Sequence, residues 1–322
     1  MNRWYLSDIA QALDGVVLTA DTSFEGVSID SRTIKSGEIF IALQGDNFDG
    51  NNFIEQVEHK GAAAIITNNK NIFTSLPILY VADTNVAFAK LSAWIREQFV
   101  GTIIGITGSC GKTTLKEMLL WLLESNYNTL ATLANHNNQI GVPLTLCGLS
   151  SEYEMAIVEM GASKQGDIDY IAALAKPDIA VITNIAHAHI ASMHNLATVA
   201  AVKGEIFNHL SRKGTAVIPH NLPYDEQWRA QLDQQSILTF GTSVGANYQA
   251  QDITMTQYGM EFSLIVELAD TQEQLTISLP LWGKHNVHNA LAAIAIAHNL
   301  NLSLTDIALA LKELVPVKSI TL

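Results

Sequence analysis

The fold is decided by 102-TIIGITGSCGKTTLKEMLL-120, in which an apolar run ends in a glycine-rich turn and a helix follows. Such a turn gathers backbone N–H groups around one point, and the helix N-terminus adds roughly half a positive charge there. Lys112 is placed to reach phosphate oxygens, and the Thr113 hydroxyl is placed to bind Mg²⁺. The strict pattern G-x-x-x-x-G-K-[ST] is not met, because Ile106 stands where its first glycine belongs. Two interpretations stay open: a nucleotide loop in which Gly108 makes the tight turn, or a plain strand–helix turn with a surface lysine.

The composition limits the classes of partner. A length of 322 residues suggests two domains, and a hydrophobic share of 48% is ample for buried cores. With 31 acidic against 18 basic residues the formal charge is −13, which disfavours nucleic acid and anionic lipid as partners. No apolar run reaches the ~18 residues that span a bilayer, and the 2 cysteines make no disulfide framework. We therefore expect a cytoplasmic protein with no nucleic-acid partner and no membrane insertion.

The rhythm of apolar segments changes along the chain. From residue 102 strands and helices alternate, which predicts a mostly parallel, doubly wound sheet with helices on both faces. Polar and apolar residues alternate over 248–282, which predicts an antiparallel addition at the sheet edge. The segment before residue 100 is typical of a small α/β unit, with a last helix that we expect to be capped at Thr84. The sequence therefore predicts an α/β fold with two domains, 1–100 and 101–314.

Polar residues follow two further strands of the predicted sheet. Glu159 stands at the end of one strand, and Asn184, His187 and His189 follow another. Because ligands bind at the carboxyl ends of parallel strands, these side chains and Lys112 are expected at one edge of the sheet. A carboxylate next to a threonine hydroxyl is a usual Mg²⁺ environment beside phosphates. Taken singly, Glu159 could instead partner a helix N-cap, and His187 could be a solvated loop residue.

Three other polar positions each allow two interpretations. Lys203, in a helix soon after the histidines, could form a salt bridge to a nearby acid. Asn286 and Asn289, at the start of a helix, could contact a base edge or cap the helix. Arg32, in a segment rich in turn residues, could hold a diphosphate through forked hydrogen bonds or form a surface salt bridge.

The chain resembles the Mur ligases of peptidoglycan synthesis. Their nucleotide loop reads T-G-[ST]-x-G-K-T-[ST], and 107-TGSCGKTT-114 matches it, including the lack of the first glycine. Further segments resemble the family in the same order along the chain: 30-DSRTIKSGEIFIALQGDNFDG-50, 135-NHNNQIGVPLTL-146, 159-EMGASKQGDI-168, 182-ITNIAHAHI-190, 202-VKGEIF-207 and 283-GKHNVHNALAA-293. The Glu-Met-Gly-Ala segment resembles the members that use UDP-N-acetylmuramoyl-tripeptide and D-alanyl-D-alanine, whereas tripeptide-forming members tend to have Glu-x-Ser-Ser there.

The resemblance implies ATP and Mg²⁺ as cofactors and assigns roles to matching positions. The residues implied around ATP are Gly108, Ser109, Gly111, Lys112, Thr113, Thr114, Asn286 and Asn289, the two asparagines at adenine. The implied metal ligands are Thr113, Glu159, His189 and Lys203, the lysine after carbamylation by CO₂. Catalytic roles are implied for Lys112, Lys203 and His189. The implied substrate contacts are Ser31 and Arg32 at the UDP moiety and Asn137 and Asn138 near the muramoyl part.

The reaction that the resemblance implies needs no protein nucleophile. The substrate carboxylate attacks the γ-phosphate of ATP and becomes an acyl phosphate, and the amine of the dipeptide then displaces phosphate. Family members continue with a third α/β domain after a Gly-Arg pair, where this chain has Ser319-Ile320 and ends soon after. We therefore expect 315–322 to begin a connection to an absent domain, and the chain to be a monomer that binds the UDP-substrate with little turnover. The alternatives are a P-loop NTPase of another class, or a non-catalytic module derived from the ligase.

Overall fold

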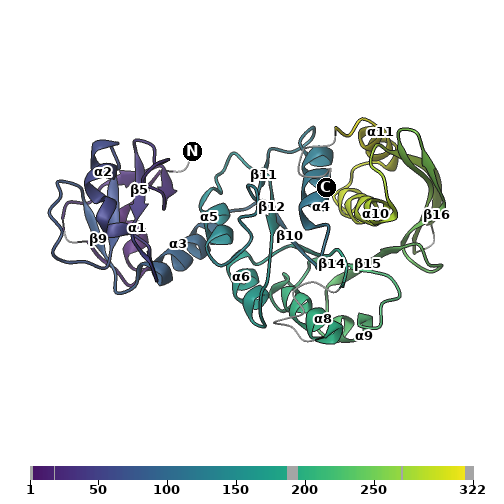
Figure 1. Ribbon diagram of the computed structural model, residues 1–322, viewed down its shortest axis with the longest axis horizontal. Helices are drawn as coiled ribbons and strands as arrows, with labels where there is room; N and C mark the ends of the chain where they lie inside the picture. Colours follow the sequence, from purple (N-terminus) through teal and green to yellow (C-terminus); the bar gives the residue numbers. More distant parts are fainter. Residues whose placement is uncertain (1–2, 18, 187–194, 270, 316–322) are drawn as a thin grey trace. The chain divides into compact units, whose positions relative to one another are not determined.

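Two larger sheets organise the residues that the computed structural model describes, which are 3–17, 19–186, 195–269 and 271–315 (Figure 1). The chain divides into two compact units, each with one of these sheets. The first unit comprises Met1–Val100 and Pro143–Glu152, and the second comprises Gly101–Val142 and Tyr153–Leu322.

Within the described residues, the second unit carries a nine-stranded sheet in the order β11-β12-β10-β13-β14-β15-β16-β17-β18. The strands are β10 (Thr102–Thr107), β11 (Thr129–Ala131), β12 (Met155–Glu159), β13 (Ile179–Ile182), β14 (Thr215–Pro219), β15 (Ser236–Gly241), β16 (Tyr248–Thr256), β17 (Gly259–Leu268) and β18 (Thr271–Leu279). All pairs from β11 to β16 are parallel, and β17 and β18 continue antiparallel. The predicted parallel sheet with an antiparallel edge is therefore confirmed.

Helices cover both faces of this sheet (Figure 1). The helices described within the second unit are α4 (Lys112–Leu123), α6 (Asp167–Ala175), α8 (Leu196–Gly204), η2 (Glu205–His209), α9 (Asp225–Arg229), α10 (Lys284–Asn299) and α11 (Leu304–Lys312). The helix α5 (Gly141–Cys147) has residues of both units. Side chains alternate along a strand: Ile104 and Ile106 of β10 join the core under α4, α10 and α11, whereas Gly105 faces Ile206 of η2. The sheet is thus doubly wound, as the sequence predicts.

The path of the chain brings three strand ends together. From β10 the chain passes to β11 and β12 on one side of β10, and then to β13 on its other side. The carboxyl ends of β12, β10 and β13 are therefore neighbours where the strand order reverses. In open α/β sheets this switch point is where ligands bind.

The first unit has a smaller, mixed sheet in the order β2-β9-β8-β5-β4. Its strands are β2 (Val16–Val17), β4 (Gly26–Ser28), β5 (Glu38–Ile41), β8 (Ala64–Thr67) and β9 (Ile78–Tyr80), and only β2 pairs antiparallel. Its other elements are β1 (Trp4–Tyr5), α1 (Leu6–Ala10), β3 (Ser23–Phe24), β6 (Gln44–Gly45), β7 (Phe48–Asp49), η1 (Gly50–Phe53), α2 (Ile54–His59) and α3 (Thr84–Gln98). Every residue of β8 is buried, as expected of a strand between two parallel neighbours.

The start of α3 differs from the prediction. Asp83, not Thr84, is the N-cap, and its carboxylate accepts hydrogen bonds from the N–H groups of Asn85 (2.8 Å) and Val86 (3.0 Å). The Thr84 hydroxyl is buried without a partner among the described residues. Aspartate and threonine are both good caps, so two adjacent candidates cannot be separated by residue type alone.

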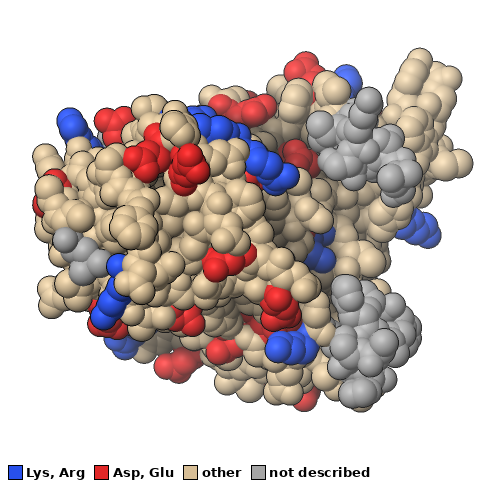
Figure 2. Space-filling model, turned by 60° about the vertical axis from the view of Figure 1, so that its left-hand side comes forward, with Lys and Arg blue, Asp and Glu red and all other residues tan. Residues whose placement is uncertain are grey.

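Charges of both signs are mixed on the surface. Lys and Arg are interspersed with Asp and Glu over the described part of the face in Figure 2. Among the described residues, no helix is long and apolar enough to cross a membrane.

Candidate active site

The turn between β10 and α4, residues 108–111, is called the glycine loop here, and two of its positions require glycine. Gly108 has φ +144°, and a Cβ at this position would lie 2.0 Å from Thr183 Oγ1. Gly111 has φ +81° as the N-cap of α4, and its Cβ would lie 2.5 Å from Asn289 Oδ1. Both backbones are in the left-handed region that favours glycine. The loop can therefore approach Thr183 and Asn289 this closely only because residues 108 and 111 are glycines, which have no side chain.

The glycine loop forms hydrogen bonds with residues 183–186, the segment that directly follows β13. The backbone N–H groups of Ser109 and Cys110 donate to the backbone oxygen (3.1 Å) and the side-chain oxygen (3.0 Å) of Asn184. The Asn184 amide and the Thr183 hydroxyl both donate to the Cys110 carbonyl, at 3.0 and 2.6 Å. The Ser109 hydroxyl exchanges bonds with the backbone of Ala186. The loop is therefore fixed by the chain that leads towards the predicted histidines.

The helix α4 begins at Lys112, directly after the glycine loop, and its N-terminus is a source of positive charge. The first N–H groups of a helix have no intrahelical acceptor, and Gly111 offers no side-chain cap. Lys112 Nζ donates to the Gly108 carbonyl at 2.9 Å, so the side chain folds back over the loop. Burial lowers the pKa of the Lys112 ammonium, and the Glu159 carboxylate acts in the opposite direction. The helix end and the lysine together suit an anion.

The Glu159 carboxylate lies beside α4 at the end of β12. The side chain is 1% exposed, yet both of its oxygens have partners. Oε2 accepts from the Thr113 hydroxyl at 3.0 Å, and Oε1 accepts from the Asn137 amide at 2.7 Å. A carboxylate and a hydroxyl in contact, next to an anion-binding helix end, match the oxygen ligands that Mg²⁺ prefers.

A polar cavity of about 160 Å³ opens next to these groups. It is lined by Lys112, Asn137, Asn138, Gln139, Gly161, Ala162, Ser163, Asp167 and Lys203. Lys203, on α8, is 3% exposed. Burial and the positive charge of Lys112 lower the pKa of Lys203 to about 8, against smaller opposing effects of Glu205 and Asp167.

Neither nearby carboxylate forms an ion pair with Lys203. Asp167 accepts from the N–H groups of Ser163 and Lys164 and from the Gln139 amide. Glu205 accepts from the N–H groups of Gly166 and Asp169. Among the described residues Lys203 has no salt-bridge partner, so the structure does not favour that interpretation of it.

Asn286 and Asn289 lie behind the glycine loop at the start of α10. Both are buried, and the Asn289 oxygen lies against Gly111. The Asn286 amide donates back to the Trp282 carbonyl at 2.9 Å, and Asn289 donates to the Asn286 oxygen at 3.4 Å. The N-cap of α10 is Gly283, so Asn286 does not cap the helix in the way that the alternative expected.

Ser31 and Arg32 line a separate pocket of about 510 Å³ in the first unit. The rings of Phe48 and Phe53, which also line it, stack at 17° with centroids 5.5 Å apart. The Arg32 side chain is 82% exposed and forms a two-pronged ion pair with Asp30. Hydrogen bonds from Arg32 lower the pKa of Asp30 to about 2. The surface salt bridge considered for Arg32 is therefore present, at the mouth of a pocket with an aromatic wall.

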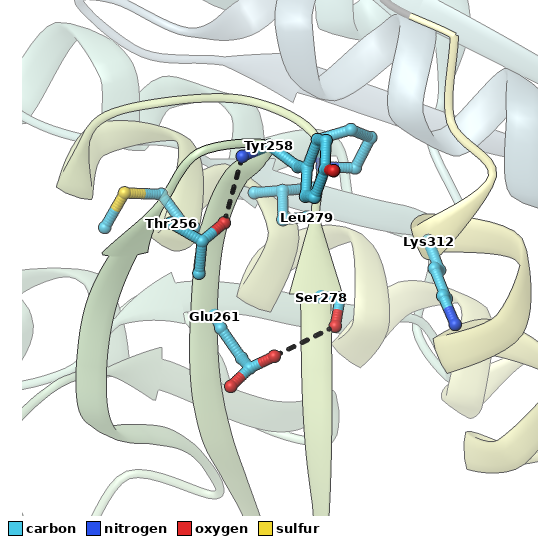
Figure 3. Close-up of a pocket in the computed structure, with 8 residues that line it drawn as sticks. Thr256, Tyr258, Glu261, Ser278, Leu279 and Lys312 are labelled. Carbon is cyan, nitrogen blue, oxygen red and sulfur yellow. Dashed lines mark hydrogen bonds between the residues drawn. The ribbon is translucent and has the colours of Figure 1, made fainter.

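Figure 3 shows a third pocket, of about 350 Å³, at the antiparallel end of the large sheet. Glu261 of β17 bonds to Ser278 of β18 on one side, Tyr258 lies above them, and Lys312 of α11 stands opposite. None of the residues that the sequence singles out lines this pocket.

Comparison with known proteins identifies the family. The Mur ligase middle domain matches residues 106–297, and the Mur ligase family catalytic domain matches residues 23–97. The UDP-N-acetylmuramoyl-tripeptide–D-alanyl-D-alanine ligase of Escherichia coli (strain K12) is 36% identical over 310 residues, which are 96% of this chain and 68% of that protein. The chain belongs to the Mur ligase family.

Solved structures of Mur ligases share the fold. MurF from Acinetobacter baumannii superimposes with a TM-score of 0.89 at 34% identity, covering 99% of this chain and 70% of that one. The MurF ligase from Thermotoga maritima, solved in complex with ADP, gives a TM-score of 0.79 at 27% identity and covers 91% and 66%. The resemblance read from the sequence is confirmed, and this Mur ligase chain spans about two thirds of the length of these relatives.

The structure brings together some predicted site residues of the Mur ligase chain and leaves others apart. Residues gathered at the switch point are Gly108, Ser109, Gly111, Lys112, Thr113, Asn137, Asn138, Glu159, Lys203 and Asn289. Thr114 follows in the first turn of α4. His187 and His189 lie outside the described residues, and within those residues no group of three His, Cys, Asp or Glu could hold a metal.

Five residues that line the cavity were not predicted from the sequence, namely Gln139, Gly161, Ala162, Ser163 and Asp167. Asp167 and Gln139 bond to each other at 2.8 Å and line the cavity with Lys203. The segment 161–167, which follows Met160 and the end of β12 at Glu159, offered a signal for four of them, because a strand end that leads to a tight polar turn often faces a ligand.

Proposed function

We propose that this chain forms the substrate-binding and ATP-binding parts of a ligase that joins D-alanyl-D-alanine to UDP-N-acetylmuramoyl-tripeptide. The Thr113–Glu159 contact at the α4 N-terminus, beside the partly buried Lys112 and the buried Lys203, carries the proposal. The proposed domains are 1–100 for the UDP-substrate and 101–314 for ATP. A relative at 36% identity is named for this reaction, and another Mur ligase was solved in complex with ADP.

The residues present fit a nucleotide with Mg²⁺. Glu159 Oε2 and the Thr113 hydroxyl, 3.0 Å apart, would both be ligands of the cation. The N–H groups of the first α4 turn and Lys112 would hold the phosphates. Bound there, Mg²⁺ would neutralise charge on the transferred phosphoryl group. Further proposed contacts are Asn286 and Asn289 to adenine and Asn137 and Asn138 to the muramoyl part, with His189 as a second metal ligand.

The first-unit pocket suits the UDP moiety of the proposed substrate. The stacked rings of Phe48 and Phe53 form a flat apolar wall, on which a base can stack. Ser31 and Arg32 line the same pocket, and the exposed Arg32 guanidinium would be accessible to the phosphate oxygens of a bound UDP moiety. Because Asp30 already holds Arg32, a diphosphate would share this arginine with the aspartate.

In the proposed reaction the protein positions reactants and neutralises charge. The tripeptide carboxylate attacks the γ-phosphate and becomes an acyl phosphate, and the dipeptide amine then displaces phosphate. Lys112 and the α4 N–H groups would stabilise the charge that builds on the phosphoryl oxygens. Glu159 would fix the position of the cation. Both nucleophiles in this reaction belong to the substrates, so the protein needs only to position the reactants and stabilise charge.

We also propose that Lys203 is carbamylated. The ammonium would first lose one proton, and the neutral amine would then add to CO₂, forming an N–C bond and releasing a second proton. A cation thereby becomes an anionic oxygen ligand. Burial, the cavity and the lack of an ion pair within the described residues all suit this change.

Labelling with ¹³C-bicarbonate is expected to give a carbamate signal in the ¹³C NMR spectrum of the wild-type chain. The Lys203→Ala variant should lack the signal, because no other amine combines this burial with a lowered pKa near 8 in the described residues. The exposed Lys213→Ala variant is the matched control and should keep it. A wild-type spectrum without the signal under saturating CO₂ would contradict carbamylation.

A thermal-shift panel tests the proposed function. UDP-N-acetylmuramoyl-tripeptide and ATP–Mg²⁺ should each raise the melting temperature, because a ligand stabilises the state that it binds. UDP-N-acetylmuramoyl-dipeptide and GTP–Mg²⁺ should have smaller effects. A GTP preference without a UDP-sugar response would indicate an NTPase of another class. A UDP-sugar response with no ATP–Mg²⁺ response would indicate a non-catalytic module. The cytoplasmic location and monomeric state stay predictions.

A further inference from the structure

Lys116 is a buried lysine of α4, close to Thr113 and Glu159, and it takes no part in the proposed reaction. Lys116 is 2% exposed and stands one helical turn after Thr113, on the same side of α4. Its Nζ donates to the Thr132 carbonyl at 2.8 Å and pairs with Glu117 Oε1 at 3.0 Å. Burying an ammonium group is costly even when it is paired, and an apolar side chain would fill the same space. Stability alone therefore does not account for a lysine here.

Thr132 connects this lysine to the Glu159 backbone. It follows β11 directly, is 1% exposed, and donates its N–H to the Ile157 carbonyl of β12 at 2.9 Å. Its hydroxyl accepts from the Glu159 N–H at 3.0 Å. Lys116, Thr132 and Glu159 thus form one chain of hydrogen bonds from the interior of α4 to the end of β12.

The helix α4 holds Glu159 from two sides. Thr113, in its first turn, contacts the carboxylate, and Lys116, one turn later, fixes the residue that anchors the Glu159 backbone. We infer that Lys116 and Thr132 are positioning residues that set the place of the Glu159 carboxylate for a bound Mg²⁺. The inference rests on the proposed function, because it requires that Glu159 binds Mg²⁺. Partners of a metal ligand tune metal affinity without touching the metal.

The Thr132 hydroxyl allows a matched pair of variants. Thr132→Val keeps the shape of the side chain and removes the acceptor, whereas Thr132→Ser keeps the hydroxyl. The experiment titrates Mg²⁺ at saturating ATP and measures the Mg²⁺ concentration at half of the maximal thermal shift. Thr132→Val should raise this midpoint about tenfold, the lower end of the ~10–100-fold range for such partners, and Thr132→Ser should leave it near the wild-type value.

Lys116→Met is the second variant, and it should raise the Mg²⁺ midpoint in the same way. Glu117→Gln is its control: it removes the partially exposed acid, keeps the bond to Thr132 and should leave the midpoint near that of the wild type. ATP with EDTA measures nucleotide binding without the cation, through Lys112 and the α4 N-terminus. Thr132→Val and Lys116→Met should leave that response unchanged, which a merely structural role would not do.

Each outcome decides the inference. If Lys116→Met does not fold, the Thr132→Val and Thr132→Ser pair decides it alone. A wild-type midpoint in Thr132→Val, or an equal weakening of the responses with and without Mg²⁺, would overturn the inference and leave the proposed function in place. A wild-type chain with no Mg²⁺-dependent response to ATP would overturn both.

Discussion

The Lys112→Ala variant is expected to lose stabilisation by ATP–Mg²⁺ and to keep stabilisation by UDP-N-acetylmuramoyl-tripeptide. Lys112 lies over the glycine loop next to Glu159, whereas the predicted UDP pocket belongs to the first unit. Ligand at 100 times Kd stabilises a protein by about 2.7 kcal/mol, and a hundredfold weaker Kd leaves about 0.4 kcal/mol. The nucleotide-induced thermal shift of the variant should therefore almost vanish.

Without ligand, the Lys112→Ala chain should lose at most about 1 kcal/mol of stability relative to the wild type, because the partly buried ammonium already carries a desolvation cost. Lys213→Ala, at an exposed position of the same unit, is the matched control for loss of a positive charge. An unchanged ATP–Mg²⁺ shift in Lys112→Ala would show that the nucleotide does not use this loop. Loss of both shifts would indicate a folding defect.

The Gly108→Ala variant is expected to lower the free energy of unfolding by about 2–4 kcal/mol, the sum of backbone strain and overpacking. A Cβ at this position would lie 2.0 Å from the Thr183 hydroxyl oxygen and 3.0 Å from the Thr183 backbone nitrogen. The φ of +144° adds strain that a side chain would increase. Urea titration measures the loss, and the nucleotide-induced shift should also disappear because the loop must move.

Two further variants separate the clash from the strain. Gly166→Ala is the control, because Gly166 has φ +85° with open space around it, and strain alone should cost about 1 kcal/mol. Adding Thr183→Ala to Gly108→Ala removes the hydroxyl but leaves the backbone contact, so only partial recovery is expected. A Gly108→Ala chain as stable as Gly166→Ala would contradict the close approach.

Most of the large sheet could be predicted from the sequence because its strands are apolar runs separated by helices of clear period. Strand β11 was not predicted, because its 3 residues are half-buried and too few to show a period. The cap of α3 was assigned one residue late, since Asp83 and Thr84 are both cap formers. The fold class thus follows from pattern, whereas short edge strands and cap positions depend on tertiary contacts.

The site was predictable where it follows from topology. Lys112, Thr113 and Glu159 end neighbouring strands or begin the helix between them, and so they had to meet. The bond from Asn137 to Glu159 was not predictable, because Asn137 lies in a loop whose path no period reveals. Lys203 was open to a salt bridge from sequence alone, and only the structure shows the nearby carboxylates bonded to backbone N–H groups. The pair Asp30–Arg32 could have been read from its spacing of two residues.

A loop that is hydrogen-bonded to a neighbouring segment of the chain loses its conformational freedom when the protein folds, not when a ligand arrives. Ser109 and Cys110 already have their backbone partners in residues 183–186. An anion that reaches the α4 N-terminus therefore meets a preorganised surface, and little of the binding free energy is spent on ordering the chain.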